Sequence, residues 1–120
     1  MAPGQLSQTV LHITTLDRWH GADGLYTDPS LHTDGFIHCS TIDQVLIPAN
    51  ERFSRRTDLV ILVIDTEAVD ADIVFEDCYE AGTAFPHIYG PIPTAAVSAV
   101  VAFPPDADGS FSLPPALTVK

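Results

Sequence analysis

Three of the five histidines stand in the same local pattern, each followed two positions later by a hydroxyl side chain. The pairs are His12 with Thr14, His38 with Ser40, and His87 with Tyr89. Side chains alternate between the two faces of a β-strand, so each histidine and its hydroxyl would share one face. Isoleucine occupies an alternate position in each run and would point to the core: Ile13, Ile37 and Ile88. The pattern predicts three strands whose histidines lie within the span of one ligand.

Imidazole suits several kinds of chemistry. It acts as a general acid or base near neutral pH, and it can donate a hydrogen bond to a ribose hydroxyl or a phosphate oxygen. Three histidines can also hold Zn²⁺ with an open fourth position. A metal site is not our prediction, because no histidine pair has helical i, i+4 spacing and no carboxylate adjoins the three in sequence. A structural alternative stays open, in which strand histidines hydrogen-bond the backbone of a neighbouring strand.

Two groups of charged residues add to the candidate site. Arg52, Arg55 and Arg56 are three of the five basic residues of the chain, and arginine binds phosphate or carboxylate bidentately. They would clamp an anion, although cations are also favoured at the end of a helix. Glu76 follows two apolar residues at a predicted strand end and is the candidate catalytic carboxylate. Cys39 alternates away from His38, which disfavours a Cys–His nucleophile.

The elements that must position these residues follow from apolar periodicity. Strands are predicted by short apolar runs and by one near-continuous β-branched run, at residues 9–14, 35–40, 58–65, 73–78, 85–89 and 96–103. A helical turn is expected over 15–21 and a loop over 22–33. One main helix is expected over 41–55, with a kink or split at Pro48. Six short strands with one main helix predict an α+β fold.

Length and charge limit the remaining possibilities. The 120 residues carry a net charge of −11, which argues against nucleic acid or an anionic membrane as a partner. No apolar run approaches the ~20 residues of a membrane helix, and no signal peptide is visible. With two cysteines, Cys39 and Cys78, we expect a reduced, cytoplasmic, monomeric protein. We expect a flexible N-terminus over 1–8, one domain over 9–103 and a loose, proline-rich tail over 104–120.

Five sequence blocks, in this order and spacing, resemble those of one small family of bacterial and plant proteins, domain of unknown function family 952. The blocks are Leu11-His-Ile-Thr-Thr with Trp19, Gly35-Phe-Ile-His-Cys-Ser-Thr with Gln44, Asp58-Leu-Val-Ile-Leu, Phe75-Glu76, and Phe85-Pro-His-Ile-Tyr-Gly-Pro. The family has no established activity. The resemblance implies a fold similar to ADP-ribosyltransferases, with two small, mostly antiparallel sheets around a cleft for a nicotinamide dinucleotide.

The resemblance also implies roles for the matching residues. His12 would lie against the ribose, and the block from Phe36 to Thr41 is similar to the second motif of the RNA 2′-phosphotransferase branch. The third motif usually supplies a glutamate. This chain departs from it, with His87 and Tyr89 in that region and Glu76 upstream.

Two functions from different classes remain. The first is an enzyme that takes NAD or another ADP-ribosyl nucleotide as its substrate and acts at the ribose anomeric carbon. Its catalytic groups would be His12, His38, His87 and Glu76, and its substrate-binding residues would be Thr14, Ser40, Thr41, Tyr89, Arg52, Arg55 and Arg56. The alternative is a non-catalytic module that binds a nucleotide or a protein in the same cleft. A zinc hydrolase with three histidine ligands ranks below both.

Overall fold

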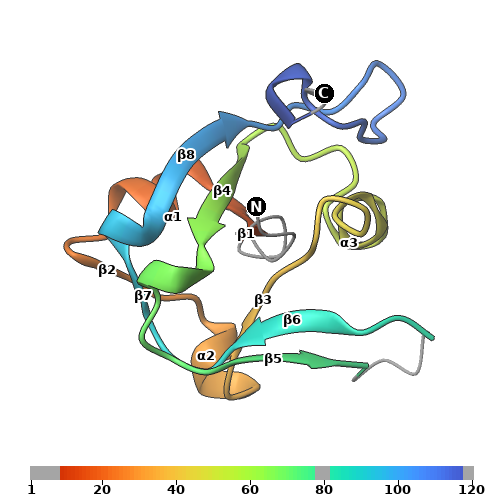
Figure 1. The fold of residues 1–120 in the computed structure, drawn as a ribbon. Coiled ribbons are helices and arrows are strands. Elements are labelled where there is room, and N and C mark those ends of the chain that lie inside the picture. The colour runs from red at the N-terminus through yellow and green to blue at the C-terminus, as the bar shows by residue number, and fades with distance from the viewer. Residues whose placement is uncertain (1–8, 78–81, 118–120) are drawn as a thin grey trace, which may run out of the picture.

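Antiparallel sheets make up the fold in the computed structural model, which describes residues 9–77 and 82–117 (Figure 1). The first sheet has the order β1-β4-β8, from Thr9–Thr15, Leu59–Asp65 and Val97–Ala102. The second pairs β2 (Leu25–Tyr26) with β7 (Ile92–Pro93). The third has the order β3-β6-β5, from Ile37–His38, Phe85–Ile88 and Ile73–Glu76. Every one of these pairings is antiparallel, which confirms the α+β prediction.

The helices are short and lie between the strands. They are α1 (Leu16–His20), α2 (Ser30–Thr33), α3 (Leu46–Arg52), and the 3-10 turns η2 (Thr66–Ala68), η3 (Thr94–Ala96) and η4 (Pro115–Leu117). The main helix, predicted over 41–55, begins only at Leu46, after a turn. Pro48 therefore occupies the third helical position, where a backbone N–H has no partner within the helix. The predicted split at Pro48 does not occur for this reason.

Two clusters of buried side chains cover the two faces of the first sheet. On one face, Val10 and Leu62 pack with Ile37 and Ile88 of the third sheet. On the other face, Leu11 of β1 packs with side chains from α3 and with two phenylalanines, and Ile13 lies against this second cluster. The predicted alternation is therefore confirmed, and the histidine face of β1 is buried between sheets.

The predicted strands appear with shorter bounds at the third sheet. The run over 35–40 yields only the two residues of β3, and the run over 73–78 yields β5, with Cys78 outside the described residues. The region 22–33, predicted to be a loop, contains β2 and α2. Two-residue strands carry too little pattern to be distinguished from loops in sequence. Among the helices of the described ranges, none has the length and apolar character to cross a bilayer.

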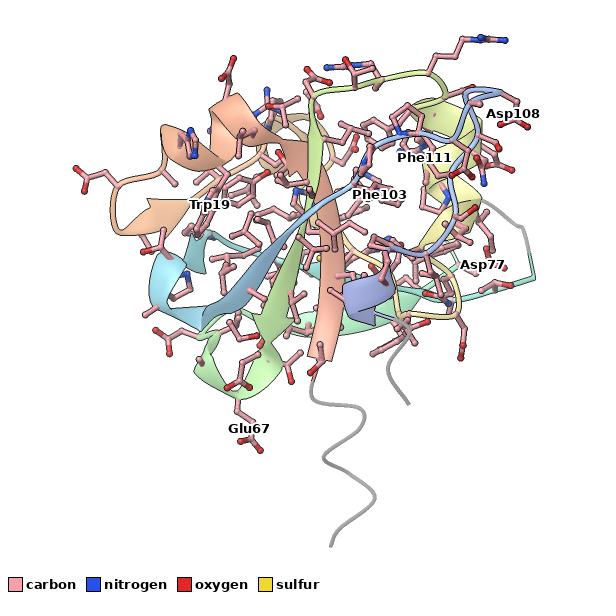
Figure 2. All side chains as sticks on the ribbon, turned by 90° about the horizontal axis from the view of Figure 1, so that it is seen from above. Trp19, Glu67, Asp77, Phe103, Asp108 and Phe111 are labelled. Carbon is pink, nitrogen blue, oxygen red and sulfur yellow. The ribbon has the colours of Figure 1, made fainter. Side chains whose placement is uncertain are left out.

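The segment after β8 packs against the second cluster, although the sequence predicted a loose tail there. Phe111 is 4% exposed and stacks on Phe103 with ring centroids 4.6 Å apart, and Figure 2 shows both at the edge of the sheet near α3. The amide of Asn50 accepts from the Phe111 N–H at 2.7 Å and donates to its carbonyl at 3.4 Å. The prolines and aspartates around Phe111 led to the prediction of a loose tail, because they outnumber its apolar residues locally. Residues 1–8 and 118–120 lie outside the described part.

Replacing Phe111 with alanine should lower the free energy of unfolding by about 3–5 kcal/mol, because it opens a cavity against Phe103 and α3. Urea unfolding followed by circular dichroism measures the change. The neighbouring exposed Ser112→Ala serves as the control and should cost less than about 1 kcal/mol. Equal stability of the two variants would show that the tail contributes no packing.

Candidate functional site

A pocket of about 350 Å³ opens where the edge of β1 meets β3 beneath α3. Its polar lining comes from β1, α2, β3 and α3 and from the loops beside them: His12, Asp28, Ser30, Asp34, His38, Ser40, Glu51 and Arg52. Apolar side chains complete it, among them Leu11, Ile47 and Phe85. Two backbone hydrogen bonds between Leu11 and Ser40, at 2.7 and 2.8 Å, hold the two strands together at this point. The pocket combines apolar walls with a few convergent polar groups, which is typical of a ligand site.

His12 is fixed at the back of this pocket by both ring nitrogens. Nδ1 lies 2.6 Å from the carbonyl oxygen of His38, which can only accept, so Nδ1 carries a proton. Nε2 lies 2.8 Å from the hydroxyl of Tyr26, which in turn lies 2.8 Å from the Thr14 hydroxyl. Burial raises the pKa of Tyr26 above its ordinary value. Nδ1 of His12 thus bonds to the backbone of a neighbouring strand. This is the structural alternative that the sequence left open for strand histidines.

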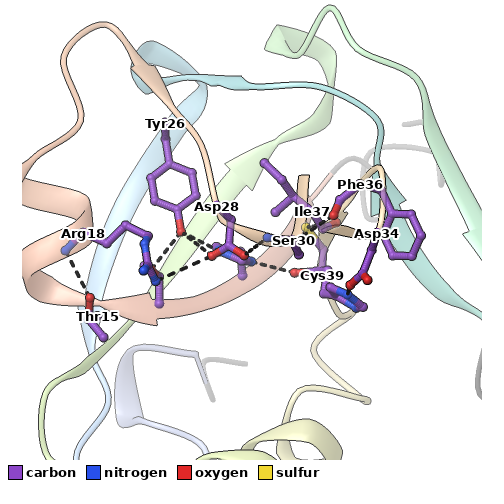
Figure 3. Close-up of polar contacts among 12 residues, drawn as sticks. Thr15, Arg18, Tyr26, Asp28, Ser30, Asp34, Phe36, Ile37 and Cys39 are labelled. Carbon is purple, nitrogen blue, oxygen red and sulfur yellow. Dashed lines mark hydrogen bonds and ion pairs between the residues drawn. The ribbon is translucent and has the colours of Figure 1, made fainter. Parts of the chain in front are cut away.

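Asp28 joins this network from the loop between β2 and α2 (Figure 3). Its Oδ2 accepts from the Ser30 N–H at 3.1 Å, and its Oδ1 lies 3.3 Å from the Tyr26 hydroxyl and 3.6 Å from Nε2 of His12. Burial alone would raise the pKa of Asp28. The nearby charge of His12, together with the hydrogen bond from the Ser30 N–H, outweighs burial and holds that pKa below its usual range. Asp28 therefore stays ionised beside the pocket.

His38 forms the wall opposite α3. Its Nε2 lies 2.8 Å from Oδ2 of Asp34, four residues earlier. Burial lowers the pKa of His38, and the nearby charges of Arg52 and His87 lower it further, while Asp34 opposes them. The net direction is downward, so His38 is mostly uncharged at pH 7.

His87 belongs to a neighbouring network, on the face of the third sheet that also carries His38. The buried ring of His87 stacks on Phe36, with centroids 3.9 Å apart, and its Nδ1 lies 2.8 Å from the Glu76 carboxylate. The Tyr89 hydroxyl donates to the same carboxylate oxygen at 2.5 Å. The hydrogen bonds from Tyr89 and then His87 lower the pKa of Glu76. The rings of His38 and His87 lie 5.5 Å apart, so His87 supports the wall that His38 forms.

The structure brings together only part of the predicted site. Four of its residues line the pocket: His12, His38, Ser40 and Arg52. His87 does not line it but lies behind His38, with the two ring centroids 5.5 Å apart. The other predicted residues lie outside the lining: Thr14, Thr41, Glu76, Tyr89, Arg55 and Arg56. Glu76 is directed at His87 and Tyr89, and Thr14 at Tyr26.

The predicted clamp of three arginines does not form. Arg56 pairs with Asp58 through Nε at 3.0 Å and a terminal nitrogen at 2.7 Å, and both side chains are exposed. Arg55 has a positive φ of 70° and bonds through its N–H to the carbonyl of Gly109. Arg52 alone of the three reaches the pocket, because α3 ends there and the chain turns away.

Sequence reasoning missed three carboxylates that line the pocket, Asp28, Asp34 and Glu51. It also missed the hydrogen bond by which Tyr26 holds His12. One signal was available: Asp28-Pro29-Ser30 is a typical start of a helix. It locates α2, but it does not show that the Asp28 carboxylate also reaches β1.

Cys39 lines the pocket, but its side chain is buried. Burial raises the pKa of Cys39 far above its ordinary value, which makes its thiol a poor nucleophile. No group of three or more His, Cys, Asp or Glu side chains within 9–77 and 82–117 is placed to hold a metal ion. Both nitrogens of His12 are already engaged, so the zinc alternative lacks one of its three ligands.

Replacing Tyr26 with phenylalanine should destabilise the fold by about 1–3 kcal/mol, because it removes the hydroxyl between buried His12 and Thr14. Urea unfolding at pH 7 measures this loss. Tyr89→Phe is the matched control. It removes an exposed hydroxyl and should cost less than about 1 kcal/mol. An unchanged free energy of unfolding in Tyr26→Phe would mean that the network adds no stability.

The stability contributed by Asp28 should depend on pH. Its folded pKa lies below the unfolded value of about 3.9, so its contribution is complete above that value and disappears as pH falls through the folded pKa. The difference in unfolding free energy between wild type and Asp28→Asn should therefore be largest near pH 7 and shrink below about pH 4. Asp43→Asn, at an exposed position, controls for net charge. A difference independent of pH would contradict this account.

Solved structures of CC0527 from Caulobacter crescentus match this fold. Its crystal structure matches with a TM-score of 0.82 and 28% identity, over 92% of this chain and 99% of that chain. Its solution NMR structure matches with a TM-score of 0.72 and 25% identity, over 94% and 99% of the two chains. A comparison with curated proteins finds no match.

The matching family covers most of the described fold. Its model spans residues 13–100, from β1 into β8, and so includes the blocks that contain His38 and His87. This bears out the resemblance found in the sequence, and the chain belongs to the protein family of unknown function DUF952.

Proposed function

We propose that the pocket binds an ADP-ribosyl nucleotide such as NAD as its substrate, and that the protein transfers or releases the ribosyl group at the anomeric carbon. The observation that carries this proposal is that His12, His38 and Ser40 line one cavity. The family resemblance places His12 against the ribose, and His38 and Ser40 come from the block that is similar to the second motif. A cavity of about 350 Å³ lies at the small end of ligand pockets, which span about 300–1,000 Å³, and suits one nucleoside-sized part of a larger molecule.

The proposed reaction breaks the bond between ribose C1′ and the nitrogen of the pyridinium base. The electron pair of that bond leaves with the base, which becomes neutral. Positive charge builds on the ribose ring until the oxygen of an acceptor hydroxyl or water adds to C1′ and releases its proton. His38, largely uncharged at neutral pH, is the pocket group suited to take that proton. Arg52 at the rim is suited to a phosphate oxygen.

A non-catalytic binding module is the second candidate, and one observation favours it. Glu76, the glutamate upstream of the region that matches the third motif, does not line the pocket, and both His87 and Tyr89 bond to it. The pocket would then bind the nucleotide without turnover.

A ¹H–¹⁵N shift titration with NAD, ADP-ribose and nicotinamide tests the proposal. NAD should shift amides of residues 11–13, 38–40 and 47–52, and His38→Ala should weaken binding at least about tenfold. His20→Ala, an exposed histidine outside the pocket, is the matched control and should bind as the wild type does. Shifts confined to other surfaces, or none with any compound, would contradict the proposal. Nicotinamide release followed over time by chromatography separates the enzyme from the binding module.

A further inference from the structure

The formal charges of the pocket are mostly negative. Three carboxylates line it, from Asp28, Asp34 and Glu51, against one guanidinium, from Arg52. The carboxylates come from different parts of the chain, two from the loops that flank α2 and one from α3. These carboxylates therefore repel a pyrophosphate, which carries two negative charges, and attract a cation. The negative charge is a property of the cavity itself and does not follow from the family resemblance.

One hydroxyl group in the pocket is available to a ligand. Ser40 is 4% exposed and lines the cavity, and its backbone pairs with Leu11. Within the described part of the chain, the Ser40 hydroxyl itself makes no hydrogen bond. A hydroxyl that opens into the cavity from a largely buried residue can bond to a ligand with polar groups of its own. This favours a hydroxylated ligand over a simple ammonium or guanidinium ion.

From these observations, and on the basis of the proposed function, we propose that the pocket selects a positively charged five-membered sugar ring and excludes the pyrophosphate. The carboxylates of Asp28 and Glu51 face the charge of the ring, and Ser40 binds its hydroxyls. The remainder of a nucleotide would extend past Arg52, outside the cavity.

Asp28 is the carboxylate that should contribute most. Its side chain is 18% exposed, less than the 46% of Asp34, which is bonded to His38. Charges interact more strongly where water is excluded. Arg18 lies 3.8 Å from Asp28, but 42% of its side chain is exposed, so water screens this partner. His12 sits at 3.6 Å and already bonds to Tyr26 and His38.

Two probes that differ only at the ring atom test the charge. These are 1,4-dideoxy-1,4-imino-D-ribitol, whose ring nitrogen is protonated, and neutral 1,4-anhydro-D-ribitol, whose ring atom is oxygen. Binding is measured by calorimetry at pH 7 and ~150 mM salt, which screens the diffuse attraction of an acidic surface for any cation. The wild type should bind the imino compound at least about tenfold tighter than the anhydro compound. Pyrrolidinium chloride, a ring cation without hydroxyls, should bind more weakly than the imino compound.

Three variants locate the charge. Asp28→Asn and Glu51→Gln should each reduce the preference for the imino compound at least about threefold. Glu51 is exposed, so its replacement should not disturb the fold. Asp43→Asn, which removes one charge outside the pocket, should keep the full preference. Equal binding of the two probes, or a preference that survives both pocket variants, would overturn the inference.

The outcomes for the inference and for the proposed function can be told apart. If NAD shifts the pocket amides while the imino compound does not bind there, the charge selectivity is wrong and the nucleotide function stands. If the imino compound binds with the expected preference while NAD and ADP-ribose do not, the charge selectivity stands and the nucleotide function is wrong.

Discussion

The junction between β1 and the end of β3 is the constraint on which the site depends. Leu11 and Ser40 exchange two backbone hydrogen bonds, and Nδ1 of His12 bonds to the carbonyl of His38 at 2.6 Å. These bonds join the edge of the first sheet to the edge of the third. They place His12 and Ser40 at the same cavity, and they leave room for α3 to close it from above. Without the junction, the two sheets would touch only through their apolar faces.

The polar side chains around His12 are buried at this junction with hydrogen-bond partners. The Tyr26 hydroxyl is within hydrogen-bond distance of His12, Thr14 and Asp28. Its ring lies in the hydrophobic cluster that packs the first sheet against the third. Hydrogen bonds specify directions and distances more strictly than apolar contacts do, so the network fixes how the sheets meet. The hydrophobic cluster provides the driving force for packing, and the polar network selects one arrangement.

The sequence predicts the parts of this structure that arise from local periodicity. The long strands and the shared face of each histidine with its hydroxyl follow from alternation, which acts over two residues. The gathering of Tyr26, Asp28 and Asp34 around the cavity depends on how the loops fold back, and no periodic pattern encodes that. The same limit explains Glu76: its position at a strand end was predictable, whereas its orientation toward His87 and Tyr89 depends on strand pairing. The three arginines lie close together in sequence, but the turn after α3 separates them: Arg52 lines the pocket, and Arg56 pairs with Asp58.

The two walls of the pocket differ in how firmly the fold holds them. β1 pairs with β4 over seven positions, whereas β3 pairs with β6 over only two. Local opening therefore costs less free energy on the β3 side than in the first sheet, and amide hydrogens there exchange sooner. A ligand that bridges both walls binds only the closed form, so it raises the free energy of opening of the weaker wall by mass action. Occupancy of the cavity is thereby coupled to the local stability of a strand only two residues long.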